Sequence, residues 1–290
     1  MAYISGIIDL HMHSTVSDGT DASEALPGIM RSAGIALFSV TDHDAIKTAG
    51  MIRGALTDGD PAFIPGVEFS CGDGNGKYHI LGYGFDPDDK AIRRVVDYGH
   101  NIRMGKVRER LGMLDAMFGI RFPGRDVNEL LHLDNPGKPH IANLLIKYGY
   151  SGSIREAMRE YIDPLRITEA HVSPKEAIAG IAAAGGVAVL AHPFFGSGDE
   201  LIIGDEMDKR LARLKGYGLE GIEAYYSGFS SKLINEALYL ADRYDLLITA
   251  GSDYHGSNKL VKPADTGLTP GVAYPPGLIR FLHRFGFEVK

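Results

Sequence analysis

Residues 6–13 of this 290-residue chain read GIIDLHMH, in which a short apolar run over residues 6–10 contains Asp9 and is followed at once by two histidines. Such a run is typical of a buried β-strand, and the polar side chains come where that strand ends. His11 and His13 are two residues apart, so on an extended chain they point to the same side and can hold one metal ion. Alone, this pair is a weak indication of a metal site, and its weight depends on the residues at the ends of the other strands.

Six further apolar runs of the same kind follow along the chain. They cover residues 36–40, 62–67, 78–83, 186–190, 219–224 and 246–250. Helix-like segments lie between most of them, and the clearest begins at Ser173, which can cap a helix while Glu176 reaches back to it. This alternation of strands and helices predicts a mostly parallel sheet or barrel.

Histidines and carboxylates collect near the ends of these runs. After the first run they are Asp9, His11, His13 and Asp18, and further along they are Asp42, His43, Asp44, Glu68, His79, His192, Asp253 and His255. Active sites of parallel α/β barrels lie at the C-terminal ends of the strands, so we expect these side chains to meet. Imidazole and carboxylate ligands together suit zinc, manganese or iron. The sequence therefore predicts a metal centre.

The composition narrows the class of protein further. The chain is 44% apolar and 23% charged, which is ordinary for a soluble enzyme, and no apolar run approaches the roughly 20 residues of a membrane span. No leader segment is visible, so we expect a cytoplasmic protein with no membrane contact and no obligate protein partner. Cys71 is the single cysteine, which excludes an internal disulfide and predicts a small buried residue. The net charge of −7 argues against broad binding of nucleic acid.

Residues from about 90 to 170 break the alternation of strands and helices. Val107, Leu111 and Leu114 recur at helical spacing, and no convincing strand appears before Gly186. This predicts a helical insertion between the fourth and fifth strands, so that the chain divides into residues 1–92, 93–170 and 171–290. Residues 93–110 hold six lysines and arginines against two acids, which fits either a solvated helix face or a lid that attracts anions.

In their order along the chain, these motifs resemble those of the polymerase and histidinol phosphatase (PHP) family of metal-dependent phosphoesterases. The residues that carry the resemblance are Asp9–His13 with Asp18 and Gly19, Thr41–Asp44, Gly66–Glu68, Ala191–Pro193 and Gly251–His255. The resemblance covers about residues 4–90 and 171–270. It implies a distorted (β/α)7 barrel, in agreement with the seven apolar runs.

The same resemblance implies three divalent metal ions, of manganese, iron or zinc. The first would be held by His11, His13, Glu68 and Asp253, the second by Glu68, His79 and His192, and the third by Asp18, His43 and His255. Many relatives have a histidine where Asp18 stands. The aspartate and the helical insertion are similar to the branch that acts on nucleotides, which includes phosphatases and a 5′-end RNA exonuclease.

That branch carries a basic-Pro-His segment in its insertion, which here reads Lys138-Pro139-His140. An arginine is expected at the first position, and a lysine offers a point charge without the bidentate fork. The resemblance implies substrate binding by Lys138 and His140, and we add Ser17 and Tyr225 as candidates. The expected catalytic residues are Glu68, His140 and Asp253.

The expected reaction is hydrolysis of a phosphate monoester of a small nucleotide-like substrate, such as AMP or a nucleoside 3′,5′-bisphosphate. A hydroxide that bridges two metal ions beside Glu68 would attack phosphorus in line. Three divalent ions bring +6 and the carboxylates of Glu68, Asp253 and Asp18 supply −3, so the excess of about +3 favours an anionic substrate.

Three alternatives stay open. A 5′-to-3′ exonuclease on short RNA is favoured by the basic start of the insertion and disfavoured by the overall acidity. A histidinol-phosphate phosphatase is disfavoured by Asp18. A binding module without catalysis is disfavoured because every expected metal-ligand position is filled.

The sequence leaves the roles of several other side chains open. Asp42 and Asp44 could orient an imidazole or cap a helix. Tyr226, like Tyr225, could stack on a base or pack in the core. For His100, His132, His171 and His283 we expect only surface or structural roles.

Overall fold

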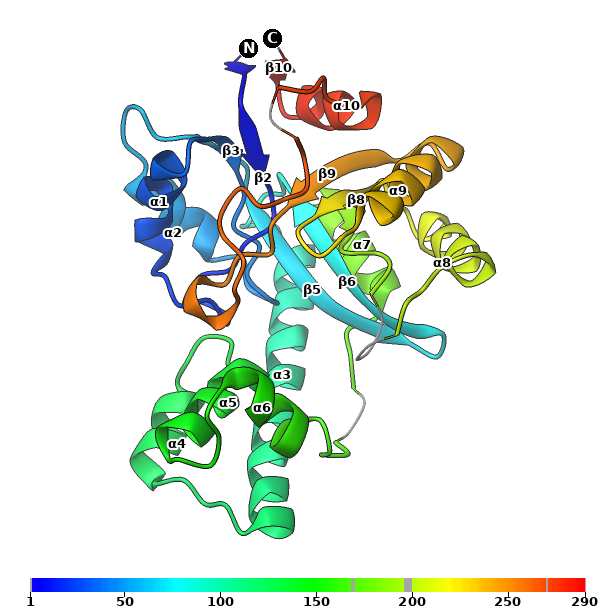
Figure 1. The fold of residues 1–290 in the computed structure, drawn as a ribbon. Helices are drawn as coiled ribbons and strands as arrows, with labels where there is room; N and C mark the ends of the chain where they lie inside the picture. The colour runs from blue at the N-terminus through cyan, green and yellow to red at the C-terminus, as the bar shows by residue number, and fades with distance from the viewer. Residues whose placement is uncertain (1, 168–169, 196–199, 270, 290) are drawn as a thin grey trace.

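The computed structural model describes residues 2–167, 170–195, 200–269 and 271–289, and its strands form three sheets (Figure 1). A parallel three-stranded sheet consists of β2 (Ile7–Asp9), β3 (Ile35–Phe38) and β4 (Ala62–Phe63). A five-stranded sheet consists of β5 (Gly66–Asp73), β6 (Gly76–Tyr83), β7 (Val187–Leu190), β8 (Gly221–Tyr226) and β9 (Leu247–Gly251). The third sheet pairs β1 (Ala2–Ile4) with β10 (Phe287–Val289) near the two chain ends.

Each of the seven apolar runs forms a strand, and the third run forms two. The run at residues 62–67 is divided into β4 and the start of β5, with Ile64 and Pro65 between them. Proline has no N–H to donate to a sheet, which accounts for a break at this place.

The expectation of a mostly parallel arrangement is wrong for β6, which runs antiparallel to both β5 and β7. The reason is the length of the connection: only Gly74 and Asn75 lie between the paired residues Asp73 and Gly76. Two residues suffice for a hairpin, whereas a parallel pair needs a crossover of a dozen or more residues. The pairs β7–β8 and β8–β9 are parallel, as expected.

Isolated contacts connect the two larger sheets. The Leu10 N–H donates to the Ala250 carbonyl at 2.8 Å, which joins the end of β2 to β9. On the other side, His43 and Glu68 form an isolated parallel bridge, which joins the segment after β3 to β5. These contacts bring the ends of strands from both sheets to one place.

Helices cover the outer faces of the sheets (Figure 1). On the side of β2 and β3 lie α1 (Leu26–Ser32) and α2 (Thr48–Ala55). On the side of the five-stranded sheet and beyond it lie α7 (Pro174–Ala183), α8 (Asp205–Gly216), α9 (Ser231–Arg243) and α10 (Pro276–Arg284). Short 3-10 turns at Ser23–Ala25 and Gly256–Asn258 complete this part of the chain.

The helix predicted after Ser173 is confirmed as α7, but its predicted capping hydrogen bond is not formed. Among the residues described, the Ser173 side chain accepts no bond from the first turn. Pro174 occupies the first helical position, where it removes one N–H that would otherwise need a partner.

The predicted helical segment consists of α3 (Lys90–Phe118), α4 (Gly124–Leu131), α5 (Lys138–Lys147), α6 (Ile154–Ala157) and a π-helical turn (Met158–Ile162). Asp89 caps α3 by accepting from the Ala91 N–H, and Gly119 ends it with a φ of 68°. Figure 1 shows α3 running away from the sheets toward a lobe that contains α4, α5 and α6.

A second apolar core, separate from the one under the sheets, holds this lobe together, and Val107, Leu114 and Leu145 are among its buried residues. The predicted insertion also includes residues 168–169, which lie outside the described residues. Within the described ranges, none of the helices combines the length and the apolar character that a membrane span requires.

Candidate active site

The structure brings all nine predicted metal-binding residues into one cluster, in which seven are buried and His79 and His192 are partly exposed. His13, Asp18, His43 and His255 form one group whose ligand atoms lie within 4.8 Å of one another. His11, His13 and Asp253 form a second such group, and His43, Glu68 and His79 form a third. His192 completes the cluster, because its Nε2 lies 3.2 Å from Oε1 of Glu68.

Glu68 lies at the centre of this cluster and is 1% exposed. Its Oε2 lies 3.3 Å from Nε2 of His11, 3.1 Å from Nε2 of His13 and 3.1 Å from Nδ1 of His43. Its Oε1 lies 2.7 Å from Nδ1 of His79. Burial alone would raise the pKa of Glu68, but the charges of His79, His11 and His43 outweigh burial and hold the pKa well below its usual value.

The donor atoms fit a metal ion in both chemistry and spacing. Two ligands that are each about 2.1 Å from one ion lie about 3.0–3.4 Å apart in tetrahedral or octahedral geometry, close to the separations around Glu68. Among the described residues, Nδ1 of His43 and Nδ1 of His79 are buried and make no hydrogen bond, because the nearby Glu68 oxygens do not have the angles that a hydrogen bond requires. Buried imidazole nitrogens are expected to have partners, so these two are suited to a metal.

Asp253 has two oxygens with different surroundings. Its Oδ1 faces three imidazoles, at 3.5 Å from His11, 3.4 Å from His13 and 3.4 Å from His255. Its Oδ2 accepts hydrogen bonds from the hydroxyl of Tyr226 at 2.9 Å and from Nζ of Lys259 at 2.5 Å. One oxygen is thus held in place while the other is turned toward the cluster.

Glu223 is a second buried carboxylate that stands behind two candidate ligands. Its Oε1 lies 2.9 Å from Nδ1 of His11, and its Oε2 accepts the backbone N–H of His192 at 2.7 Å. The first contact favours the tautomer with the hydrogen on Nδ1, so that Nε2 is the nitrogen that a metal ion in the cluster would take. Glu223 is not among the residues predicted from the sequence; a charged residue in the middle of the apolar run 219–224 was the available indication.

Changing Glu223 to glutamine is expected to weaken metal affinity by about 10- to 100-fold, because such supporting contacts orient ligating histidines. A glutamine can accept at only one of the two positions that Glu223 serves. Metal affinity can be measured by competition with a chelator. Glu220→Gln, a more exposed position just before β8, is the matched control, and equal affinity in the two variants would show that Glu223 does not orient His11.

Asp9 and Asp42 organise the loops around the cluster. Asp42 accepts hydrogen bonds from the Ser14 N–H at 2.8 Å and from the hydroxyls of Ser14, Ser17 and Thr48 at 2.6 Å each. Asp9 accepts the N–H groups of Ser252 and Ala264, at 2.9 Å each. The two carboxylates therefore hold the loops that carry His13, Asp18 and Asp253.

Three residues of the cluster region have a left-handed backbone although they are not glycine. They are Asp44 with φ 49°, His192 with φ 25° and Asp253 with φ 59°. Such conformations are costly and persist at functional sites because the surrounding contacts enforce them.

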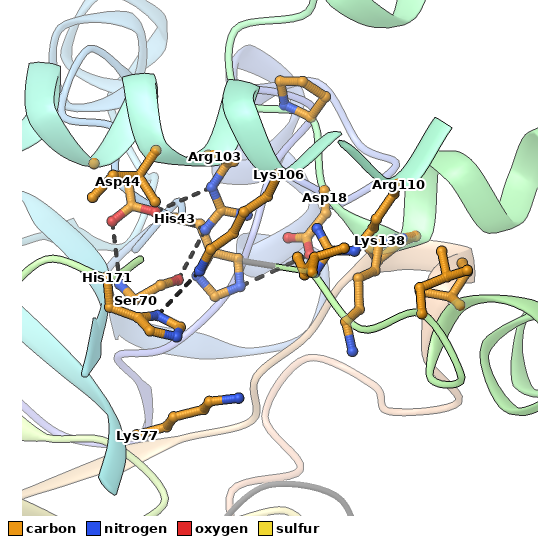
Figure 2. A pocket seen from close by; sticks show the side chains of 18 of the residues that line it. Asp18, His43, Asp44, Ser70, Lys77, Arg103, Lys106, Arg110, Lys138 and His171 are labelled. Carbon is orange, nitrogen blue, oxygen red and sulfur yellow. Dashed lines mark hydrogen bonds and ion pairs between the residues drawn. The ribbon is translucent and has the colours of Figure 1, made fainter. Parts of the chain in front are cut away.

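A cavity of about 510 Å³ opens beside Asp18 and His43, and six lysines and arginines are among the residues that line it. Arg103, Lys106 and Arg110 reach into it from α3 (Figure 2). Their spacing of three and four residues places them on one face of the helix. Half of the six basic residues in the first part of the insertion thus line the cavity, which favours the anion-attracting interpretation over a purely solvated face.

The four predicted substrate-binding residues have different surroundings. Lys138 lines the cavity, and its Nζ lies 2.9 Å from Oδ1 of Asp163. Nδ1 of His140 accepts the Gly137 N–H at 3.0 Å, and burial lowers the pKa of this imidazole. The Ser17 hydroxyl lies 3.2 Å from Nδ1 of His13, so it contacts a candidate ligand.

Tyr225, the fourth of these residues, packs against the main apolar core. Its neighbour Tyr226 is the tyrosine that contacts Asp253, and the centres of the Tyr226 and His192 rings are 5.4 Å apart. His171, for which the sequence predicts only a surface or structural role, lines the cavity 3.2 Å from Nζ of Lys106. Cys71 is buried, as expected, and burial raises the pKa of its thiol.

A buried cluster of imidazoles and carboxylates, open to a basic cavity, defines a metal-dependent enzyme that acts on anionic esters. A search against family models gives no match. The chain is 30% identical to the 3′,5′-nucleoside bisphosphate phosphatase of Chromobacterium violaceum over 86% of its own length and 87% of that protein. It is 27% identical to the 5′-3′ exoribonuclease of Haemophilus influenzae, over 85% and 89% of the two chains.

Among solved structures, a protein of Bifidobacterium adolescentis assigned as a metal-dependent phosphoesterase has a TM-score of 0.81 to this chain. The two are 25% identical, and the match covers 96% of each. This chain belongs to the PHP family of metal-dependent phosphoesterases.

Proposed function

We propose that this protein is a metal-dependent phosphatase that hydrolyses a phosphate monoester of a small nucleotide, AMP or a nucleoside 3′,5′-bisphosphate. The observation that carries the proposal is the opening of the cluster around Glu68 into the basic cavity, with Asp18 and His43 lining both. An ester phosphate in that cavity has cationic side chains on one side and the ligand cluster on the other. The name of the Chromobacterium violaceum relative supports a nucleotide substrate with two phosphates.

The cluster would hold up to three divalent ions of manganese, iron or zinc. The nine candidate ligands for them are His11, His13, Asp18, His43, Glu68, His79, His192, Asp253 and His255. Bound metal ions lower the pKa of water and neutralise phosphoryl oxygens, which is the chemistry the reaction needs.

The chain's own residues orient the groups and supply hydrogen bonds. Glu223 holds the imidazole of His11 through Nδ1, and Oε2 of Glu68 lies 3.3 Å from Nε2 on the opposite side of the ring, where both atoms would be ligands of a metal ion. Because Nδ1 of His140 accepts the Gly137 N–H, its hydrogen stands on Nε2, where a neutral imidazole donates a hydrogen bond to an anion. The lowered pKa of His140, caused first by burial, favours this neutral form at pH 7.

We infer further that the strands form a distorted (β/α)7 barrel and that residues 93–170 are inserted into it as a helical domain, between residues 1–92 and 171–290. The contacts of Leu10 with Ala250 and of His43 with Glu68 support the barrel, because they join the two larger sheets on both sides. The separate apolar core of the helical lobe supports the insertion.

The test is phosphate release by the metal-loaded protein from AMP and from 3′-phosphorylated AMP, beside a 5′-phosphorylated RNA oligomer. We expect free phosphate from the mononucleotides and an intact oligomer. Treatment with a chelator is expected to remove the activity, and Mn²⁺ is expected to restore it. Ca²⁺ is not expected to restore it, because Ca²⁺ prefers oxygen ligands and this cluster is rich in imidazole.

A 5′-to-3′ exonuclease on short RNA is the second candidate. The basic face of α3, which continues from Arg103 to Arg110 along the cavity, favours it, as does the name of the Haemophilus influenzae relative. Shortening of the RNA oligomer with little free phosphate would establish this candidate and overturn the phosphatase.

A further inference from the structure

Arg103 of α3 stands between the ligand cluster and the helical lobe. Its side chain is 15% exposed and lines the cavity together with Asp18, His43 and Gly137. No motif of the sequence singled out this arginine from its basic neighbours.

One edge of the Arg103 guanidinium is anchored. Nε and Nη2 both donate to Oδ2 of Asp44, at 3.1 and 2.7 Å, and Nη2 also donates to the Ser70 hydroxyl at 2.9 Å (Figure 2). Asp44 is 2% exposed and directly follows the candidate ligand His43. The planar group is therefore held at a fixed place and angle.

The remaining nitrogen, Nη1, borders the cavity next to Gly137. A Cβ atom at Gly137 would stand 3.3 Å from Nη1 of Arg103 and 3.9 Å from Oδ2 of Asp18. Within the part of the chain that the structure describes, Nη1 makes no hydrogen bond. A guanidinium nitrogen thus remains available beside the cluster, and it carries hydrogens that suit a phosphate oxygen.

The neighbouring basic residue is engaged elsewhere. Nζ of Lys138 lies 2.9 Å from Asp163, at the start of the loop after the π-helical turn. Lys138 stands where the resemblance to the nucleotide branch predicts an arginine. The anchored Arg103 offers a guanidinium to the same cavity from a different helix.

We propose that Arg103 binds the phosphate group of the substrate through Nη1, while Asp44 and Ser70 hold its other edge. This inference rests on the proposed phosphatase function. It makes Arg103 a specificity-determining residue that contacts the substrate, and Asp44 a positioning residue that acts through it. Gly137 keeps the approach to Nη1 open, because any side chain there begins with a Cβ in close contact with it.

The first test is binding of inorganic phosphate to the metal-loaded protein by calorimetry. We expect Arg103→Lys to weaken phosphate binding by about 10- to 100-fold, because a lysine can serve Asp44 or the phosphate but not both. Arg108→Lys, an exposed position on the same helix, is the matched control and should bind as the unchanged protein does. Lys138→Gln should weaken phosphate binding less than Arg103→Lys.

The second test separates contact with the substrate from support of the cluster. Metal content is measured in each variant, and KM and kcat are measured with AMP. We expect Arg103→Lys to keep its metal and to raise KM for AMP about as much as it weakens phosphate binding.

Unchanged phosphate affinity in Arg103→Lys, loss of metal in parallel with affinity, or a larger effect of Lys138→Gln would each overturn the inference. If the unchanged protein binds phosphate but hydrolyses no nucleotide, the proposed function fails, while the comparison of phosphate affinities still decides the role of Arg103.

Discussion

Glu68→Gln is expected to lower phosphate release by about 1,000-fold or more while the fold is retained. The carboxylate of Glu68 faces five imidazoles, and its two oxygens divide them into two sets, with His11, His13 and His43 on one side and His79 and His192 on the other. A neutral amide removes the negative charge and one acceptor from the centre of this cluster. A metal ion contributes several kcal/mol to the reaction, and each 1.4 kcal/mol is a factor of about ten in rate.

The change at Glu68 is measured as kcat with AMP together with metal content per chain. Glu236→Gln, an exposed position on α9, is the control for loss of one surface carboxylate and should match the unchanged protein. Circular dichroism should show the same secondary structure in both variants. If Glu68→Gln retained full activity and full metal content, the assignment of Glu68 as the central ligand would be wrong.

The candidate ligands were predictable because the information is local. Each of His11, His43 and Asp253 follows a recognisable apolar run by a few residues, so its place at the end of a strand can be read from the sequence. Glu68 and His79 were also identified, although both lie inside the β5–β6 hairpin rather than after a strand. These two residues reach the cluster from paired positions inside the hairpin, and the pattern of apolar runs does not predict this geometry.

The residues that support the cluster were not predictable in the same way. Glu223 is 212 positions away from the His11 ring that it contacts, and Arg103 is 59 positions away from Asp44. Such partners depend on how the strands and α3 are packed, which no local pattern encodes. The pairing of β1 with β10 was not predictable for the same reason. The two strands have three residues each and lie at opposite ends of the chain, so no sequence pattern connects them.

Tyr225 and Tyr226 show that the sequence does not determine which of two neighbouring strand residues faces the site. Neighbouring residues of a strand point to opposite faces, and an error of one position moves the side chain to the other face. The β8–β9 register also shifts between Glu223 and Tyr225, which disturbs simple alternation at this place. The sequence therefore located the strand end near the site, whereas the structure was needed to find that Tyr226 contacts Asp253.

Gly251→Ala is expected to destabilise the protein by about 3 kcal/mol and to abolish metal binding. Gly251 is the last residue of β9 and is buried under the cluster. A Cβ atom at this position would stand 2.2 Å from Cβ of His11 and 2.4 Å from Oε1 of Glu223. Both neighbours are fully buried, so neither can turn away into solvent. Forcing an extra carbon into a packed interior typically costs about 1–3 kcal/mol, and the upper end applies where the contacts are this short.

The clash at Gly251 acts on function as well as on stability, because it falls on the contact that orients His11. The backbone around His11 is fixed by the hydrogen bond from Leu10 to Ala250, so a shift of His11 would also strain the junction of β2 and β9.

Urea unfolding and metal content per chain measure the two effects separately. Gly54→Ala, at an exposed position of α2 where an added Cβ meets nothing within 4 Å, is the matched control. This variant should be about 0.5–1 kcal/mol more stable than the unchanged protein, because alanine has a higher helix propensity than glycine. Equal stability and equal metal content in the two alanine variants would mean that β9 can move away from His11, and that the support of the cluster by close packing is not required.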